Sequence, residues 1–233
     1  MTIQRFVTYS ASAAAFALCA LIGVPSAHAD TIAWATWTGD APGNPGSATG
    51  TIGSINVNYA GQTDALLINY PSWAPSSSYT GGDVGNAPPQ ANNAVKLEGG
   101  SGITETITFS SPIVNPVMAI WSLGQSNDPT YFDFSSGQTF NIVAGGPSAE
   151  YGGGTITRSG QNVQGVEGNG VIEFDGTFSS ITFTTPSFEN YYAFTVGEDV
   201  NKTSVTPEPG SLALLGTGLV ALAGLRRRFT ARG

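Results

Sequence analysis

Short runs of alternating apolar and polar residues, separated by glycine-rich turns, restrict the fold of this chain more than any other feature. In ITETITF (103–109) the odd-numbered side chains share one face and the threonines occupy the other. In VIEFDG (171–176), Ile172 and Phe174 lie opposite the acidic side chains. A period of two residues is that of a half-buried β-strand, and no segment between residues 30 and 205 keeps a convincing period of 3.6. The sequence therefore predicts an all-β domain.

Strand signals recur at short intervals along this domain. We expect strands at 31–37, 51–59, 65–70, 103–109, 117–123, 130–134, 139–144, 154–159, 171–176, 180–185 and 191–197. Turn-forming residues lie between them, and strands spaced in this way are typical of two packed antiparallel sheets. We predict an antiparallel, jelly-roll-like β-sandwich at residues 30–197, followed by a polar linker at 198–206.

Two stretches of the domain resemble each other. ITFSSPIVNPVMAIWSLG (107–124) and ITFTTPSFENYYAFTVG (181–197) each contain a strand, a Ser-Ser or Thr-Thr pair before proline, a turn, and a second apolar strand that ends in glycine. Because proline cannot donate to a strand ladder, we expect Pro112 and Pro186 to end their first strands. The pattern predicts two hairpins in equivalent places, and an internal duplication is the alternative explanation.

Residues 1–29 have the organisation of a secretory signal peptide. Arg5 precedes an apolar run from Ala11 to Val24, and Ala27-His28-Ala29 supplies the small residues of a cleavage site. The run is short for a membrane span and is broken by a proline, as in a signal peptide. We expect the mature chain to begin at Asp30; an uncleaved membrane helix is the alternative.

Cleavage would remove the only cysteine and the only histidine, Cys19 and His28. Residues 30–205 therefore cannot form a disulfide, a zinc site of the Cys/His kind, or a Ser-His-Asp or Cys-His nucleophile system. They carry three basic side chains, Lys96, Arg158 and Lys202, against fifteen acidic ones. Such a surface repels nucleic acid and anionic membranes, so we expect neither as a partner of this domain.

The C-terminal end combines three features in a fixed order. Pro207-Glu208-Pro209 precedes an apolar stretch from Ser211 to Leu225, and Arg226-Arg227-Arg228 follows it. The apolar stretch predicts a C-terminal transmembrane helix, and the arginines favour the cytoplasmic side, with 229–233 as a cytoplasmic tail. The two prolines hold the preceding backbone extended, as a protease requires of its substrate.

This order closely resembles the PEP-CTERM sorting signal of exopolysaccharide-producing Gram-negative bacteria, over Val205 to about Arg228. The resemblance implies recognition by a membrane exosortase, removal of the tail near Pro207-Glu208-Pro209, and delivery to the cell surface or extracellular matrix. A plain membrane anchor is the alternative. The family is defined by its tail and signal peptide, and its central domains are diverse, so the resemblance assigns no activity to residues 30–205.

The stretch from Pro71 to Asn93 carries no strand signal, and loops of that length are usually functional or disordered. Trp73 and Tyr79 lie in it, and Tyr70 lies at its edge. Aromatic faces stack on sugar rings, so these three side chains are the candidate glycan contacts. Covering the edge of the core is their alternative role. Trp121, in a predicted strand, is expected in the core.

Oxygen-bearing side chains gather at several turns. Asp128 and Asp133 flank the turn in SNDPTYFD, and Glu167 and Asn169 are close together in VEGNG. Ca²⁺ takes six to eight oxygen ligands, so these four residues are candidate calcium ligands, although Asp and Asn also favour turns for local reasons. None of them fits an EF-hand loop, and no other cofactor is expected.

Without a thiol or an imidazole, catalysis by this domain would rest mainly on carboxylates. Glu105, Glu167, Glu173, Asp175 and Glu189 are available, but nothing in the sequence marks two of them as the pair of a glycoside hydrolase. We therefore expect a non-enzymatic exported protein with a structural, adhesive or polysaccharide-binding role at the cell surface or in the exopolysaccharide matrix. A carboxylate-dependent polysaccharide hydrolase and a passive matrix filler are the alternatives.

Overall fold

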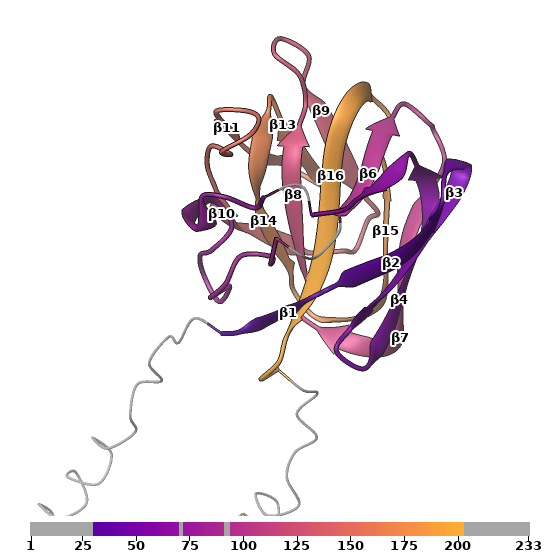
Figure 1. Ribbon diagram of the computed structural model, residues 1–233, viewed down its shortest axis with the longest axis vertical. Helices are drawn as coiled ribbons and strands as arrows, with labels where there is room; N and C mark the ends of the chain where they lie inside the picture. Colours follow the sequence, from indigo (N-terminus) through magenta and orange to yellow (C-terminus); the bar gives the residue numbers. More distant parts are fainter. Residues whose placement is uncertain (1–29, 70–71, 91–93, 203–233) are drawn as a thin grey trace, which may run out of the picture.

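The computed structural model describes residues 30–69, 72–90 and 94–202, which form a domain of β-strands (Figure 1). Within these ranges the only helix is one short 3-10 turn, η1 (Ser76–Ser78). The prediction of an all-β domain is confirmed. The predicted signal peptide, sorting segment, transmembrane helix and cytoplasmic tail lie outside the described residues. In the part of the chain that is described, no helix has the length and apolar character needed to cross a membrane.

The strands form two sheets of eight strands each. The first contains β1 (Ile32–Trp34), β5 (Ala65–Leu67), β6 (Ala94–Gly99), β8 (Val117–Leu123), β10 (Phe140–Gly145), β11 (Gly154–Thr155), β14 (Gly168–Phe174) and β16 (Phe188–Asp199). Its main order is β10-β14-β8-β16-β6-β5, with β1 beside β16 and β11 beside β14. All its pairs are antiparallel except β11 with β14.

The second sheet has the order β12-β13-β9-β15-β7-β4-β3-β2. Its strands are β2 (Thr36–Ala41), β3 (Gly43–Ile52), β4 (Ile55–Thr63), β7 (Glu105–Val114), β9 (Thr130–Phe134), β12 (Thr157–Ser159), β13 (Asn162–Gly165) and β15 (Thr177–Thr184). Consecutive strands alternate between the sheets from β6 to β9 and again from β13 to β16, so that β6, β8, β14 and β16 lie in one sheet and β7, β9, β13 and β15 in the other.

Aromatic side chains of both sheets meet in one core. The rings of Tyr59 in β4 and Phe194 in β16 pack edge to face with centroids 5.3 Å apart. Trp37 of β2 donates from Nε1 to Thr195 Oγ1 of β16 at 3.2 Å. Burial of large rings between two apolar faces holds the sheets together as a β-sandwich. The jelly-roll connectivity stays a prediction, since a jelly roll has eight strands in all, whereas each sheet of this domain has eight.

Local alternation located several strands correctly and three wrongly. The segments 31–37 and 154–159, each predicted as one strand, are divided between the two sheets as β1 and β2 and as β11 and β12. The segment 130–134 is β9, as predicted, and the alternation in 103–109 buries Glu105, Ile107 and Phe109. The single strand predicted at 51–59 is wrong, because residues 53–54 form a two-residue turn between β3 and β4. Gly53 has a φ of 53°, a conformation that glycine adopts without strain.

The two similar stretches are not hairpins. β7 and β8 lie in different sheets, as do β15 and β16, so each connection crosses the sandwich. The stretches are nonetheless equivalent, because β7 pairs with β15 and β8 pairs with β16. Pro186 follows the end of β15 as predicted, whereas β7 continues through Pro112, with a register irregularity against β15 between Phe178 and Ser180.

The loop at 72–90 covers the outer face of the first sheet. Trp73 and Tyr79 are buried there, with ring centroids 5.2 Å apart, in one apolar cluster with Ala119 of β8 and Ala193 of β16. β8 is consequently buried on both faces along its whole length. This explains why VMAIWSL is continuously apolar instead of alternating.

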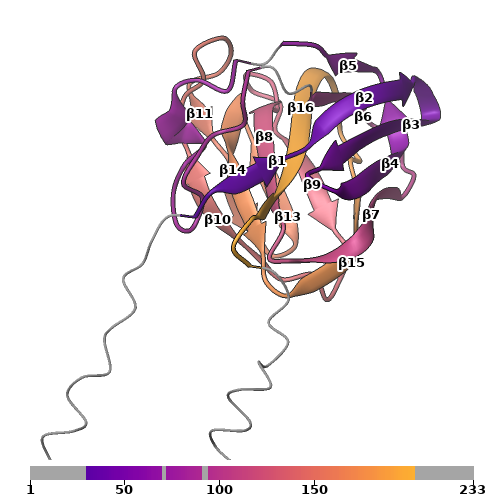
Figure 2. The same ribbon diagram turned by 60° about the horizontal axis from the view of Figure 1, so that its bottom comes forward.

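The two ends of the described domain are neighbours. β1 lies beside the end of β16, with Ile32 opposite Asp199 (Figure 2). β16 runs to Asp199, and Val200 N donates to Thr31 O at 3.1 Å. Residues 198–202, predicted as the beginning of a linker, therefore belong to the sheet and its final turn.

Candidate functional site

A pocket of about 240 Å³ lies at the end of the first sheet where β8 ends. β8 is antiparallel to β14 and β16, so the beginnings of those two strands meet its end (upper part of Figure 1). The lining combines aromatic Tyr151 and Tyr191, acidic Glu167 and Glu189, and polar Ser122, Gln125 and Asn190. β1 and the end of β16, which hold the two ends of the described domain, lie at the opposite end (Figure 1).

Three aromatic rings meet beside this pocket. Trp121 is fully buried, and its ring packs edge to face against Tyr151 at 5.6 Å and Tyr191 at 5.5 Å between centroids. The two tyrosine rings are 6.1 Å apart. Trp121 Nε1 donates to Ser148 Oγ at 3.1 Å, which fixes the indole orientation. The Tyr151 residue is 52% exposed, so a rigid aromatic base carries an accessible ring.

Two residues of the pocket have a left-handed backbone. Ser122 has a φ of 56° and Glu167 a φ of 53°, a conformation that is uncommon outside glycine and clusters at functional sites. Their side chains meet, because Ser122 Oγ donates to Glu167 Oε2 at 3.2 Å. Glu167 N donates to Gly124 O at 2.8 Å, and a Cβ on Gly124 would lie 2.1 Å from Gly165 O. A glycine is required at 124 for the two backbone segments to approach this closely.

Glu189 is the most buried acid of the pocket, with 2% of the residue exposed. Gly124 N donates to its Oε2 at 2.7 Å. The pKa of Glu189 is raised to about 7, chiefly by burial. The hydrogen bond from Gly124 N opposes the shift, and the negative charges of Glu167 and Asp128 add to it. A carboxyl group with this pKa exchanges its proton near neutral pH.

The other candidate carboxylates do not join this pocket. Glu105 is fully buried in the core, where Tyr59 OH donates to Oε2 at 2.9 Å and Thr185 Oγ1 donates to Oε1 at 2.6 Å. Burial raises the pKa of Glu105, while these hydrogen bonds oppose the shift. Asp175 is exposed at the far end of β14. Glu105 is therefore a structural acid, and the pocket brings together only Glu167 and Glu189 of the candidate set.

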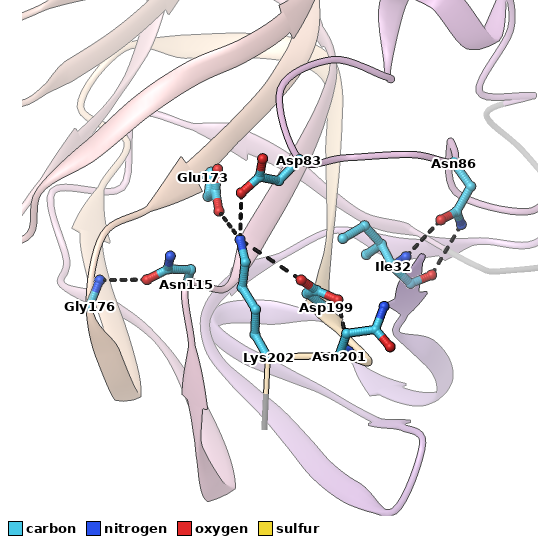
Figure 3. A network of polar contacts seen from close by, with 9 residues as sticks. All are labelled: Ile32, Asp83, Asn86, Asn115, Glu173, Gly176, Asp199, Asn201 and Lys202. Carbon is cyan, nitrogen blue, oxygen red and sulfur yellow. Dashed lines mark hydrogen bonds and ion pairs between the residues drawn. The ribbon is translucent and has the colours of Figure 1, made fainter. Parts of the chain in front are cut away.

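A second acidic cluster surrounds Lys202 at the other end of the domain (Figure 3). Lys202 Nζ donates to Asp83 Oδ2 at 2.7 Å and to Glu173 Oε1 at 3.1 Å. The buried Asp199 places its Oδ2 atom 3.8 Å from the same nitrogen. Burial lowers the pKa of Lys202, but the hydrogen bonds to Asp83 and Glu173 outweigh it and hold the pKa above its ordinary value. The cluster therefore contains a cation supplied by the chain, with one lysine serving three carboxylates.

The glycan contacts predicted in the long loop are not on the surface. Trp73 is 2% exposed and Tyr79 is fully buried, so neither ring face can stack on a sugar. They cover apolar side chains of the first sheet, which was their alternative role. Tyr79 OH also donates to Asn169 Oδ1 at 3.3 Å and ties the loop to β14. Tyr70 lies outside the described residues.

The four predicted calcium ligands do not form a ligand set. Asn169 is buried, and its Oδ1 accepts a hydrogen bond from Ser122 N at 2.8 Å, so it organises the backbone beside the pocket. Asp128 and Asp133 are exposed. Across residues 30–69, 72–90 and 94–202, no three acidic, imidazole or thiol side chains are placed to hold a metal ion.

In the sequence, Glu167 and Glu189 are two of several candidate carboxylates, and Glu167 is also a candidate calcium ligand; Ser122, Tyr151 and Tyr191 were not predicted as site residues. One signal for Tyr151 was present, since an aromatic residue directly before three glycines lies outside any strand pattern. No local sequence pattern identifies Ser122, because its role depends on the contact of its backbone N with Asn169 of β14, which is distant in the sequence.

Comparison with known proteins identifies only the C-terminal end of the chain. No curated protein and no solved structure shows significant similarity to it. The model of the PEP-CTERM protein-sorting motif matches residues 205–228, which include Pro207-Glu208-Pro209 and Arg226-Arg227-Arg228. This motif is the exosortase sorting signal and implies export with membrane-associated sorting toward the cell surface. The chain is therefore a PEP-CTERM domain-containing protein, in which the motif accounts for the tail and leaves the β-sandwich unassigned.

Proposed function

We propose that this exported protein binds polysaccharide at the surface or in the extracellular matrix, through the pocket at the end of β8, and does not cleave it. One observation carries the proposal: an accessible tyrosine on a rigid aromatic base lies beside buried and half-buried hydrogen-bonding groups in one pocket. Apolar ring faces cover the C–H surface of a sugar, while carboxylate, amide and hydroxyl groups fix its hydroxyls.

The position of the pocket in the fold supports this role. The end of β16, close to where the described domain ends, lies at the opposite end of the sandwich (Figure 1), and the sorting motif begins at residue 205. A domain held through its C-terminal end, either to the membrane before processing or to the surface afterwards, would point the pocket away from the attachment. An adhesive domain requires this orientation.

Binding is tested by isothermal titration calorimetry of the full chain in detergent with oligosaccharides from the producing organism's own exopolysaccharide. We expect saturable binding that Tyr151→Ala weakens roughly tenfold, because a ring–sugar contact is removed. Tyr131→Ala, on β9 of the other sheet, is the matched control and should bind as wild type does. No binding, or equal loss in both variants, would contradict the proposal.

A second candidate function, hydrolysis of the same polysaccharide, is favoured by Glu189. Its pKa near 7 suits a general acid, and Glu167 lies in the same pocket as a potential base or nucleophile. The two functions separate by product analysis, because hydrolysis shortens the chains. Shortening that Glu189→Gln abolishes would establish an enzyme, whereas binding with unchanged chain length supports the first proposal.

A further inference from the structure

We infer that the pocket selects sugar units that carry a protonated amine, which is the chemistry of an amino sugar with a free amino group. The inference rests on the proposed glycan binding and specifies the class of glycan for the same pocket. It depends on three observations: two carboxylates without a protein cation, an unfilled acceptor position on one of them, and aromatic faces beside both.

No basic side chain of the described residues lines the pocket with the two glutamates. Residues 30–205 contain three basic side chains. Lys202 lies in its own network, Lys96 pairs with Asp64 at 2.5 Å, and Arg158 donates to backbone carbonyl oxygens. Lys96 rests against the Tyr191 ring but is not among the residues that line the pocket. Within the described residues, positive charge for the pocket must come from a ligand.

The hydrogen bonding of the two acids leaves room for a charged donor. Glu189 accepts one hydrogen bond, from Gly124 N to Oε2, and no described residue donates to its Oε1 atom. Glu167 accepts from Ser122 Oγ, which is a neutral donor. Hydrogen bonds between ions are shorter and stronger than those between neutral groups, and an ammonium group supplies three N–H donors. An ammonium group is therefore the ligand group that these carboxylates accept best.

The aromatic side chains favour the same kind of ligand. A cation over the face of a tyrosine is attracted by the ring quadrupole. This domain already uses that interaction twice, with Lys96 Nζ 4.6 Å from the Tyr191 centroid and the Arg158 guanidinium carbon 4.1 Å from the Phe140 centroid. Tyr151 is 52% exposed at the pocket and can receive a ligand cation in the same way.

An organic cation fits the pocket better than a metal ion. Ca²⁺ requires six to eight oxygen ligands, whereas the pocket offers two carboxylates among aromatic and neutral side chains, and no described group of three acids is placed for a metal. Aromatic faces add nothing to calcium binding but do cover the C–H groups of a sugar ring.

The test compares three β-1,4-linked oligomers of equal length, made of glucosamine, N-acetylglucosamine and glucose. Each is titrated into the full chain in detergent at neutral pH and monitored by calorimetry. We expect the glucosamine oligomer to bind about tenfold more tightly than the other two, with an advantage that falls at high salt. Equal binding of all three would overturn the inference and leave the glycan-binding proposal standing. Binding of none would overturn both.

Isosteric variants locate the effect. Glu189→Gln and Glu167→Gln should each remove most of the preference for glucosamine, because binding of the glucosamine oligomer should weaken much more than binding of the glucose oligomer. Asp175→Asn removes an exposed carboxylate at the far end of β14 and should keep the full preference. Tyrosine fluorescence and circular dichroism establish that each variant is folded. A preference that survives Glu189→Gln, or Ca²⁺ binding that this variant abolishes, would overturn the inference.

Discussion

The two acidic clusters of the sandwich differ in whether the chain supplies the cation. At the end where the tail leaves, Lys202 lies among Asp83, Glu173 and Asp199. At the opposite end, Glu167 and Glu189 share a pocket with neutral and aromatic side chains. The first arrangement has a cation from the chain, which stabilises it, although the buried Asp199 Oδ2 has no hydrogen-bond partner among the described residues. The second leaves a buried carboxylate without a charged partner, which costs folding free energy and gives a ligand something to neutralise.

The largest expected effect is the contribution of Glu189 to the pH dependence of stability. The folded pKa of Glu189 is about 7 against an ordinary 4.5. Below 4.5 both folded and unfolded chains bind this proton; between 4.5 and 7 the unfolded chain loses it first, so the free energy of unfolding falls as pH rises. Glu189→Gln should remove this loss, about 3 kcal/mol above pH 7. Thermal melts across this range measure it, and parallel profiles for variant and wild type would contradict it.

The next largest effect is expected from a substitution that gives the pocket its own cation, as in the Lys202 network. Gln125→Lys places a cation beside Glu167 and Glu189, since Gln125 lines the same pocket. The new lysine should compete with the ligand and weaken glucosamine-oligomer binding roughly a hundredfold, about 2.7 kcal/mol. Gln125→Met is the size-matched control and should weaken binding far less. Unchanged binding in the lysine variant would show that the two acids do not contact the ligand.

The reverse change removes the cation from the network. Lys202→Met leaves Asp199, with a 2% exposed side chain, and Glu173 without their charged partner. Because Lys202 is itself partly solvated, we expect a loss of about 2 kcal/mol in the free energy of unfolding. Adding Glu173→Gln should recover part of it, and glycan binding at the other end should be unaffected. Thermal denaturation monitored by near-ultraviolet circular dichroism measures the change; equal stability would mean that solvent already screens the network.

The fold class was predictable because strand periodicity is local, whereas strand pairing was not. ITETITF shows its buried face in seven residues, but whether β7 turns back onto β8 or crosses to the other sheet depends on the whole sandwich. The prediction that aromatic side chains of the loop at 71–93 contact glycan was wrong for the same reason. Trp73 and Tyr79 are buried because the outer face of β8 is apolar, and that face is visible only once β8 is known to lie at the middle of a sheet.

The pocket was harder to predict from the sequence than the fold class. Glu167 and Glu189 meet only because β14 and β16 flank β8, so that the residues at the beginning of both strands reach its end. The left-handed Ser122 is set by the close approach of Gly124 to Gly165 and by the hydrogen bond to Asn169. The sorting tail, in contrast, is a linear signal and was identified from its own residues.

The smallest predicted effect concerns Lys96, which lies over the ring of the pocket residue Tyr191. Lys96 Nζ lies 4.6 Å from the Tyr191 centroid, so its charge repels a ligand ammonium beside the same ring, although Asp64 neutralises part of it. Lys96→Met should therefore strengthen glucosamine-oligomer binding about twofold at low salt and leave glucose-oligomer binding unchanged. Arg158→Met, over Phe140 in another part of the domain, is the control. If Lys96→Met weakened binding of both oligomers equally, Lys96 would be acting by holding the Tyr191 ring, and the pocket would be recognising sugar surface instead of charge.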